Sequence, residues 1–303
     1  MMKNSRYYEQ AKLMLRVLPH VAMEKCFVLK GGTALNLFLR DMPRLSVDID
    51  LTYLPIESRT ETIKNIHQSL KKISASIQRA MPDCKCLLSE SKDIAKIFVR
   101  NKIVQIKIEP NYVIRGTVFP CSERQLCAKA ETLFEMSTSI TTVSIPDLYG
   151  GKICAALDRQ HPRDFYDIKI LFENEGLTDD IRKAFVVYLA SGDRPMNEVV
   201  EPTKQNFLTL YKNEFEGMTT LPIKYQELVQ AREMLISQIK NSLSNNEKMF
   251  LLSIKAGFPK WELLGVAGID RLPAIQWKLS NINKMSAKKR SQAIELLKRK
   301  LDL

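Results

Sequence analysis

Alternation of polar and apolar residues predicts β-strands in the first half of the chain. The clearest case is the segment 46–53 (SVDIDLTY), where every second residue is apolar, as in a strand with one buried and one open face. We interpret the segments 95–100 and 103–109 as two further strands joined by a turn. A short apolar run at residues 26–29 predicts a fourth strand, and it ends in two glycines.

Helical spacing of apolar residues is typical of the remaining segments. It predicts an amphipathic helix over residues 57–81 and another over 6–18, which Pro19 is expected to end. Two helices separated near residues 160–162 follow residue 144, and the chain from about 178 onward is helical with glycine- and proline-containing breaks. This order indicates an α+β domain over residues 1–175, including the helical segment 146–172, and a helical domain over 176–303.

The composition is that of an ordinary globular protein. Of the 303 residues, 45% are hydrophobic and 26% are charged, which argues against wholesale disorder. No apolar run is long enough for a membrane span, and the N-terminal residues MMKNSRYYEQ contain no apolar segment of a secretory signal. Six cysteines and three scattered histidines predict neither a disulfide framework nor a zinc site. We therefore expect a cytoplasmic protein with reduced cysteines and no membrane partner.

Positive charge is concentrated at the C-terminal end. The net charge is +12, and residues 247–303 carry 12 basic and 5 acidic side chains, a local net charge of +7. Such a surface favours a polyanion such as RNA, DNA or an acidic protein. A solubilising tail explains the charge equally well, so charge alone leaves both interpretations open.

Candidate chemistry lies between Lys30 and Leu51. Because residues two apart on a strand point to the same side, Asp48 and Asp50 project together from the strand over 46–53. Paired carboxylates that act with substrate phosphates are the usual ligands of Mg²⁺. Gly31-Gly32 lets the backbone approach a ligand, and the helix predicted to start at Thr33 offers free N–H groups to a phosphate. These features together predict a site for a nucleoside triphosphate (NTP).

The strand over 103–109 offers a third carboxylate. Its polar residues Gln105, Lys107 and Glu109 share one face. Glu109 could therefore complete a carboxylate triad for two metal ions.

Two blocks of sequence carry a resemblance to a known family. The first is Gly31-Gly32-Thr33-Ala34-Leu35 with Arg44-x-Ser46-x-Asp48-Ile49-Asp50-Leu51, and the second is Lys152-Ile153-Cys154-Ala155-Ala156, Arg159 and Arg163-Asp164-Phe165-Tyr166-Asp167-Ile168. They resemble the AbiEii/AbiGii-type nucleotidyltransferase toxins, which belong to the polymerase-beta-like nucleotidyltransferase superfamily. The resemblance covers about residues 25–172. It implies the fold of that superfamily, a small mixed sheet with flanking helices, followed here by a helical C-terminal domain.

The resemblance implies a role for each matched residue. Carboxylates of Asp48, Asp50 and, less directly, Glu109 would bind Mg²⁺ or Mn²⁺. A second group would hold the NTP, and it comprises Gly31, Gly32, Thr33, Arg44, Ser46 and Lys152. Lys152 and Asp164 would belong to the catalytic set with the three acidic residues, although Asp164 and Asp167 could instead anchor Arg159 and Arg163.

The implied activity is metal-dependent transfer of a nucleotide from an NTP to an RNA acceptor, with the tRNA 3′ end as the suspected target. The protein would be the toxin of a type IV-like toxin–antitoxin or phage-defence system with a cognate antitoxin. Two alternatives remain open on the sequence: transfer to a protein side chain, and a nucleotide- or RNA-binding module without catalysis.

Overall fold

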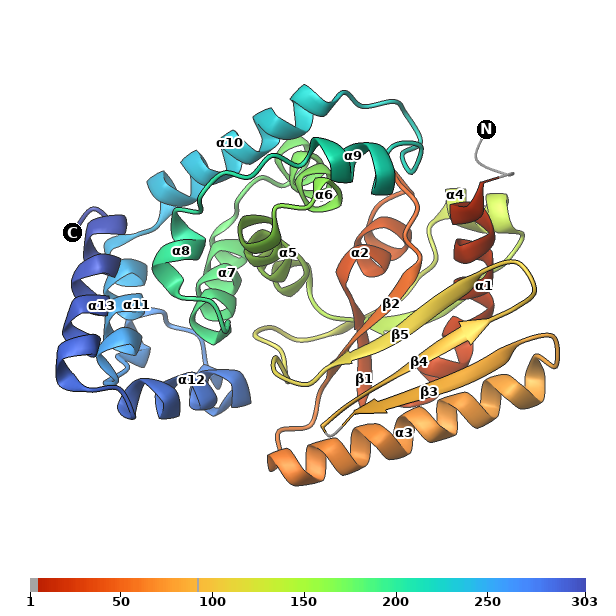
Figure 1. The fold of residues 1–303 in the computed structure, drawn as a ribbon, viewed down its shortest axis with the longest axis horizontal. Helices are drawn as coiled ribbons and strands as arrows, with labels where there is room; N and C mark the ends of the chain where they lie inside the picture. The colour runs from red at the N-terminus through yellow and green to blue at the C-terminus, as the bar shows by residue number, and fades with distance from the viewer. Residues whose placement is uncertain (1–4, 92) are drawn as a thin grey trace. The chain divides into compact units, whose positions relative to one another are not determined.

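The chain folds into two compact units, as seen in a computed structural model that describes residues 5–91 and 93–303 (Figure 1). The first unit comprises Met1–Ser144 with Gly217–Pro222, and the second comprises Ile145–Glu216 with Ile223–Leu303. This division differs from the expected boundary at residue 175, because the helices after Ser144 pack on later helices of the second unit. Residues 1–4, part of the segment considered for a secretory signal, lie outside the described residues.

A seven-stranded mixed sheet forms the first unit, with strand order β3-β4-β5-β2-β1-β7-β6. Strands β2 and β5 are parallel, as are β1 and β7, and the other neighbouring pairs are antiparallel. The predicted strands correspond to β1, β2, β4 and β5, whereas β3, β6 and β7 were not predicted. The bounds are β1 Phe27–Lys30, β2 Asp48–Tyr53, β3 Lys85–Ser91, β4 Ile94–Arg100, β5 Gln105–Asn111, β6 Ser122–Gln125 and β7 Ser139–Thr142.

Two helices cover one face of this sheet. Helix α3 (Arg59–Ala80) packs on β3 and β4, while α1 (Arg6–Ala22) packs on β5 and β7 and also contacts α3 (Figure 1). Fully buried isoleucines of β2, β4 and β5 lie beneath them at positions 49, 97 and 108. The prediction that α1 ends at Pro19 is wrong: the helix continues for another turn, which buries Val21 in the core.

The glycine turn opens an unusual helix. The α-helical residues α2 (Gly31–Thr33) continue directly into a π-helix, η2 (Ala34–Leu39). The helix thus begins two residues earlier than the predicted start at Thr33. The threonine hydroxyl does not cap the helix; it lies 2.5 Å from the carbonyl oxygen of Asp48 and thereby joins the helix to β2.

A distant segment of the chain completes the first unit. Residues 217–222 lie against the segment that precedes β2, where Leu45 N–H donates to the Met218 carbonyl at 2.9 Å and Thr220 N–H donates to the Pro43 carbonyl at 2.9 Å. Arg44 and Thr219 form an isolated β-bridge between these bonds. The segment that leads into β2 is therefore held in place by residues that lie far away in the sequence.

The second unit is helical, as the sequence predicts. Its long helices α5, α6 and α7 are joined by the turn at residues 160–161 and by a loop at 174–178. In the described part of the chain, no helix is both long and apolar enough to cross a membrane. The bounds are α5 Ile145–Arg159, α6 Pro162–Glu173, α7 Asp179–Ser191, α8 Met196–Val200, α9 Leu208–Glu214, α10 Tyr225–Ser242, α11 Asn245–Ala256, η3 Trp261–Leu263, η4 Ile269–Arg271, α12 Pro273–Asn283 and α13 Ala287–Lys300. A short helix of the first unit, α4 (Ala128–Phe134), was not predicted.

Candidate active site

Three carboxylates share the face of the sheet that α1 and α3 leave uncovered. Strands β2 and β5 pair in parallel, with Asp50 beside Glu109 and Asp48 beside Lys107. Paired residues on neighbouring strands point to the same side of a sheet, and so do residues two apart on one strand. Asp48, Asp50 and Glu109 therefore project together, as the alternation in each strand predicts, and all three side chains are partly exposed.

Gly31 is in direct contact with this group. Its φ is +71°, in the left-handed region that favours glycine. A Cβ at this position would lie 2.5 Å from Oδ2 of Asp50, closer than any real contact. Both the backbone conformation and the lack of space thus require glycine, and the predicted glycine turn lies against the predicted metal-binding carboxylate.

Replacement of Gly31 by alanine tests this contact. We expect nucleotidyl transfer to fall by about a hundredfold, because displacement of a reacting group by about 1 Å has that effect. The matched control is Gly217→Ala, which also has a left-handed φ (+81°) but no atom within 4 Å of the added Cβ. Both variants share the backbone strain of about 1–2 kcal/mol. Equal rates of transfer by the two variants would contradict the role given to the Asp50 contact.

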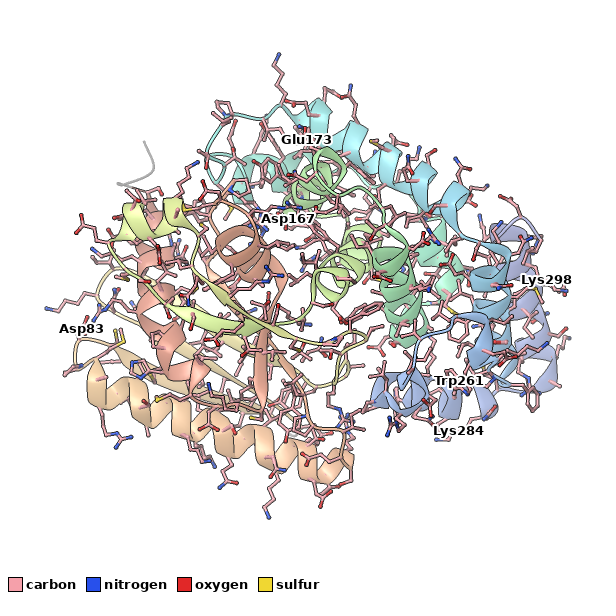
Figure 2. All side chains as sticks on the ribbon, turned by 180° about the vertical axis from the view of Figure 1, so that it is seen from behind. Asp83, Asp167, Glu173, Trp261, Lys284 and Lys298 are labelled. Carbon is pink, nitrogen blue, oxygen red and sulfur yellow. The ribbon has the colours of Figure 1, made fainter. Side chains whose placement is uncertain are left out.

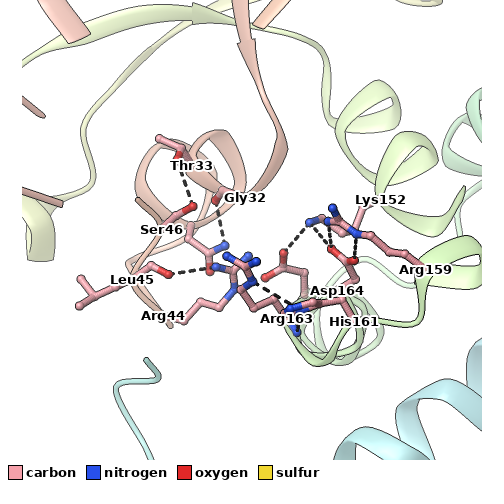
Figure 3. A network of polar contacts seen from close by, with 12 residues as sticks. Gly32, Thr33, Arg44, Leu45, Ser46, Lys152, Arg159, His161, Arg163 and Asp164 are labelled. Atoms are coloured by element: carbon pink, nitrogen blue, oxygen red, sulfur yellow. Dashed lines mark hydrogen bonds and ion pairs between the residues drawn. The ribbon is translucent and has the colours of Figure 1, made fainter. Parts of the chain in front are cut away.

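A hydrogen-bonded network holds the start of α2 against the residues that precede β2 (Figure 3). Thr33 Oγ1 lies 3.0 Å from Ser46 Oγ, and Asn36 donates to the carbonyl of Gly32 at 2.9 Å. The Arg44 side chain is 2% exposed and donates to the Leu45 carbonyl at 2.9 Å. This network fixes the turn that is predicted to hold the triphosphate.

Arg44 and Ser46 lie directly behind the second glycine. A Cβ on Gly32 would be 2.8 Å from a guanidinium nitrogen of Arg44 and 3.0 Å from Ser46 Oγ. The buried guanidinium thus places a positive charge beneath the turn, where it favours an anion.

Lys107 neutralises part of the carboxylate charge. Its Nζ lies 2.6 Å from Glu109, and Lys96 Nζ lies 3.8 Å from the same carboxylate. Burial disfavours the Lys107 ammonium, but its hydrogen bond to Glu109 and the charges of the three nearby carboxylates raise its pKa. Glu109 is thus matched by two basic side chains, so the attraction of this face for a cation comes mainly from Asp48 and Asp50.

The donor set fits a magnesium ion that retains water and substrate oxygens. Asp48 and Asp50 supply two hard oxygen donors on one face, which is the arrangement that Mg²⁺ uses with substrate phosphates. Within residues 5–91 and 93–303, no three acidic, histidine or cysteine side chains are grouped closely enough to hold a metal ion. Glu109 would have to leave Lys107 in order to join the two aspartates.

A second polar cluster is buried in the helical unit (Figure 3). Lys152 of α5 is 6% exposed, and its Nζ lies 2.9 Å from Asp164 and 3.0 Å from Asp167, both on α6. Arg159 donates to Asp164 through Nε at 2.6 Å. Burial alone would raise the pKa of Asp164, but the Lys152 charge and the Arg159 hydrogen bonds hold it well below its usual range. Asp164 thus remains ionised and anchors the side chains of Lys152 and Arg159.

A family model described as the nucleotidyl transferase AbiEii toxin of type IV toxin–antitoxin systems matches residues 12–280. The chain belongs to the AbiEii nucleotidyltransferase toxin family. It is therefore a nucleotidyltransferase toxin of a type IV system, for which NTP is the substrate and a cognate antitoxin is a partner. Enzymes of this class generally use divalent metal ions.

The chain is similar in fold to MenT4, a nucleotidyltransferase toxin from Mycobacterium tuberculosis H37Rv. The two chains are 13% identical, with a TM-score of 0.59 over 97% of this chain and 95% of MenT4. This likeness confirms the predicted fold class. A comparison with curated protein sequences gives no match.

The predicted site residues of the AbiEii toxin fall into two groups. The first unit brings together Asp50 and the glycine turn with its supporting residues, Thr33, Arg44 and Ser46, and it places Asp48 and Glu109 on the same face as Asp50. The second unit holds Lys152 and Asp164, which contact each other. Their roles toward a nucleotide stay predictions.

Two residues of this AbiEii toxin acquire a role that the sequence did not reveal. Lys107 looked like an ordinary polar position of a strand, and only the parallel pairing of β2 with β5 places it among the carboxylates. Gly150 lies where a Cβ would be 2.7 Å from the backbone nitrogen of Phe185, so it allows α5 to approach α7 closely. The only sequence signal for Gly150 was its position two residues before Lys152.

Proposed function

We propose that this toxin transfers a nucleotide from an NTP to an RNA acceptor in the presence of Mg²⁺ or Mn²⁺, and that the site of transfer is the open face of β2 and β5. The tRNA 3′ end is the suspected acceptor. The observation that carries the proposal is the position of Gly31 against Asp50, beside Glu109 in the parallel register. Phosphate-binding backbone and metal-binding carboxylates at one point suit an NTP better than any other ligand.

Each residue group has a distinct task in the proposed reaction. The backbone of Gly31, Gly32 and Thr33 would bind the triphosphate, and the buried charge of Arg44 would favour it from behind the turn. The acceptor hydroxyl attacks the α-phosphorus and pyrophosphate leaves. Asp48 and Asp50 would hold the metal ion, which supplies charge neutralisation at the reacting phosphates. Proton transfer would go to Asp50 or Glu109.

Lys152 and Asp164 complete the proposed catalytic set. Asp164 and Asp167 hold the Lys152 ammonium in one position, and Arg159 in turn fixes Asp164. Because its side chain is 6% exposed, Lys152 would have to leave these carboxylates in part to bring its charge to a phosphate.

An RNA acceptor is supported by charge. Helix α13 and the turn that precedes it present exposed basic side chains, among them Lys284 (Figure 2). RNA phosphates would release counterions on binding to such residues, so association should weaken as salt rises.

The proposed function predicts metal-dependent labelling of RNA. Incubation of the full chain with each radiolabelled NTP, Mg²⁺ and total RNA should transfer label to RNA, and EDTA should abolish the transfer. The expected product is sensitive to RNase. The control is the same incubation with Asp48→Ala, which should transfer no label.

Three other results would contradict this function. Label that resists RNase but is removed by protease would indicate a protein acceptor. Binding of NTP in calorimetry without any release of pyrophosphate would indicate a non-catalytic module. Equal labelling by wild type and Asp48→Ala would show that the reaction does not take place at the proposed site.

A further inference from the structure

The open face of the sheet continues beyond the carboxylates to the edge strand. Strand order places β5, β4 and β3 successively outward from β2. Adjacent strands lie about 4.8 Å apart, so this surface extends roughly 14 Å from Asp50 to the edge. Helices α1 and α3 occupy the opposite face (Figure 1).

The register identifies the side chains on this outer surface. Phe98 of β4 lies between Lys107 of β5 and Leu87 of β3, and Arg100 lies beside Lys85 in the next row. We call this outer part of the open face the basic strand surface. It comprises the β3 positions Lys85, Leu87, Ser89 and Ser91 and the β4 positions Ile94, Lys96, Phe98 and Arg100.

Six of the eight positions are exposed, Lys96 and Phe98 are partly exposed, and none of the eight is acidic, although Lys96 Nζ lies 3.8 Å from Glu109 of β5. Leu87 is 65% exposed and Ile94 is 50% exposed. Exposed apolar side chains at the edge of a sheet favour contact with another molecule. Lys96 lies over the Phe98 ring, 5.4 Å from its centroid. Glu90 of β3 belongs to the other face, where it pairs with Lys71 of α3.

This combination of groups matches single-stranded nucleic acid. Lysine and arginine neutralise phosphates, and an aromatic ring on an open sheet stacks on bases. A four-stranded sheet that carries such aromatics binds two or three bases in known RNA-binding domains. An acidic protein could also bind a basic surface, but an aromatic ring set among basic side chains favours a nucleic acid, whose bases stack while its phosphates pair with the charges. The geometry points to the basic strand surface as the track on which a single-stranded end of the acceptor RNA lies before it enters the carboxylate site.

The inference rests on the proposed function for the identity of the acceptor, but its test does not require turnover. Fluorescence anisotropy would measure the affinity of the full chain for a fluorescein-labelled single-stranded RNA without NTP. We expect Phe98→Ala to weaken binding about tenfold and Phe98→Trp to retain it, because tryptophan preserves the stacking surface. An unchanged melting temperature of Phe98→Ala would exclude loss of folding as the cause.

Charge is tested by a second pair of variants. The double variant Lys85→Gln/Arg100→Gln should weaken binding and lower the slope of log affinity against log salt by about 1.4, since each charge contributes about 0.7 on single strands. The matched control is Lys64→Gln/Arg79→Gln on α3, whose two exposed side chains belong to the covered side of the sheet. We expect this control to stay within about twofold of wild type.

Each outcome separates the two proposals. Wild-type RNA affinity in Phe98→Ala and in Lys85→Gln/Arg100→Gln would overturn the inference, and so would an equal loss in the α3 control. Loss of antitoxin binding by Phe98→Ala with unchanged RNA affinity would assign the surface to a protein and likewise overturn it. RNA binding that depends on this surface, in a protein that transfers no nucleotide, would overturn the proposed function alone and support the inference.

Discussion

Replacement of Asp50 by asparagine is expected to lower nucleotidyl transfer by about a thousandfold. Asparagine keeps the shape of the side chain and its contact with Gly31, but it removes one of the two charges that would hold the metal ion. Loss of metal-based stabilisation costs several kcal/mol in the transition state, and about 1.4 kcal/mol corresponds to tenfold in rate. The measurement is the initial rate of pyrophosphate release at saturating NTP.

The control for this variant is the same substitution at a remote carboxylate. Asp83 is exposed and pairs with Arg16 in a surface salt bridge, so Asp83→Asn should leave the rate unchanged (Figure 2). Calorimetric titration with Mn²⁺ provides a second readout, in which Asp50→Asn should bind the ion more weakly. A rate within tenfold of wild type for Asp50→Asn would exclude the carboxylate pair as the reaction centre.

Replacement of Lys152 by methionine is expected to destabilise the helical unit by about 3–5 kcal/mol. The substitution leaves Asp164 (0% exposed) and Asp167 (3% exposed) without their common cation, and removal of one partner from a buried ion pair has a cost of this size. Urea denaturation followed by hydrogen exchange in α5 and α6 measures the effect. Lys169→Met removes the partly exposed partner of Glu173 on α6 and should cost less than about 1 kcal/mol.

The pH dependence of the same difference provides an internal check. The pKa of Asp164 is lowered in the folded state, so its ionisation stabilises the protein above the unfolded pKa of about 3.9 and loses this effect as pH falls further. Lys152→Met reduces that lowering. The difference in unfolding free energy between wild type and variant should therefore shrink below about pH 4. A difference that is constant from neutral to acidic pH would show that Lys152 acts through packing alone.

Local patterns were sufficient to predict the parts of the site that depend on neighbouring residues. Alternation along residues 46–53 correctly placed Asp48 and Asp50 on one face, and the two glycines marked the turn that contacts them. The break between α5 and α6 followed from Pro162, which stands at the first position of α6.

Pairing between strands that are distant in the sequence could not be predicted from local patterns. The position of Glu109 beside Asp50 depends on parallel pairing of strands almost sixty residues apart, and no local pattern encodes that register. The same pairing places Lys107 among the carboxylates. Strand β7 is only four residues long and obtains its stability from pairing with β1 and β6, so it has no distinctive pattern of its own.

The domain boundary could not be predicted for a related reason. Helices α5 and α6 contain the second block of the family motif, which suggested that they belong with the sheet. Gly150 instead allows α5 to pack closely on α7, a contact that depends on the tertiary structure rather than on the motif.

The return of residues 217–222 to the sheet has a consequence for dissection of the molecule. The polypeptide crosses between the units three times, after Ser144, Glu216 and Pro222. A fragment truncated at Ser144 would lack the backbone partners of Leu45 and Pro43, just before β2. The sheet unit is thus a discontinuous domain. To produce it alone, Ser144 would have to be joined to Gly217 by a short linker.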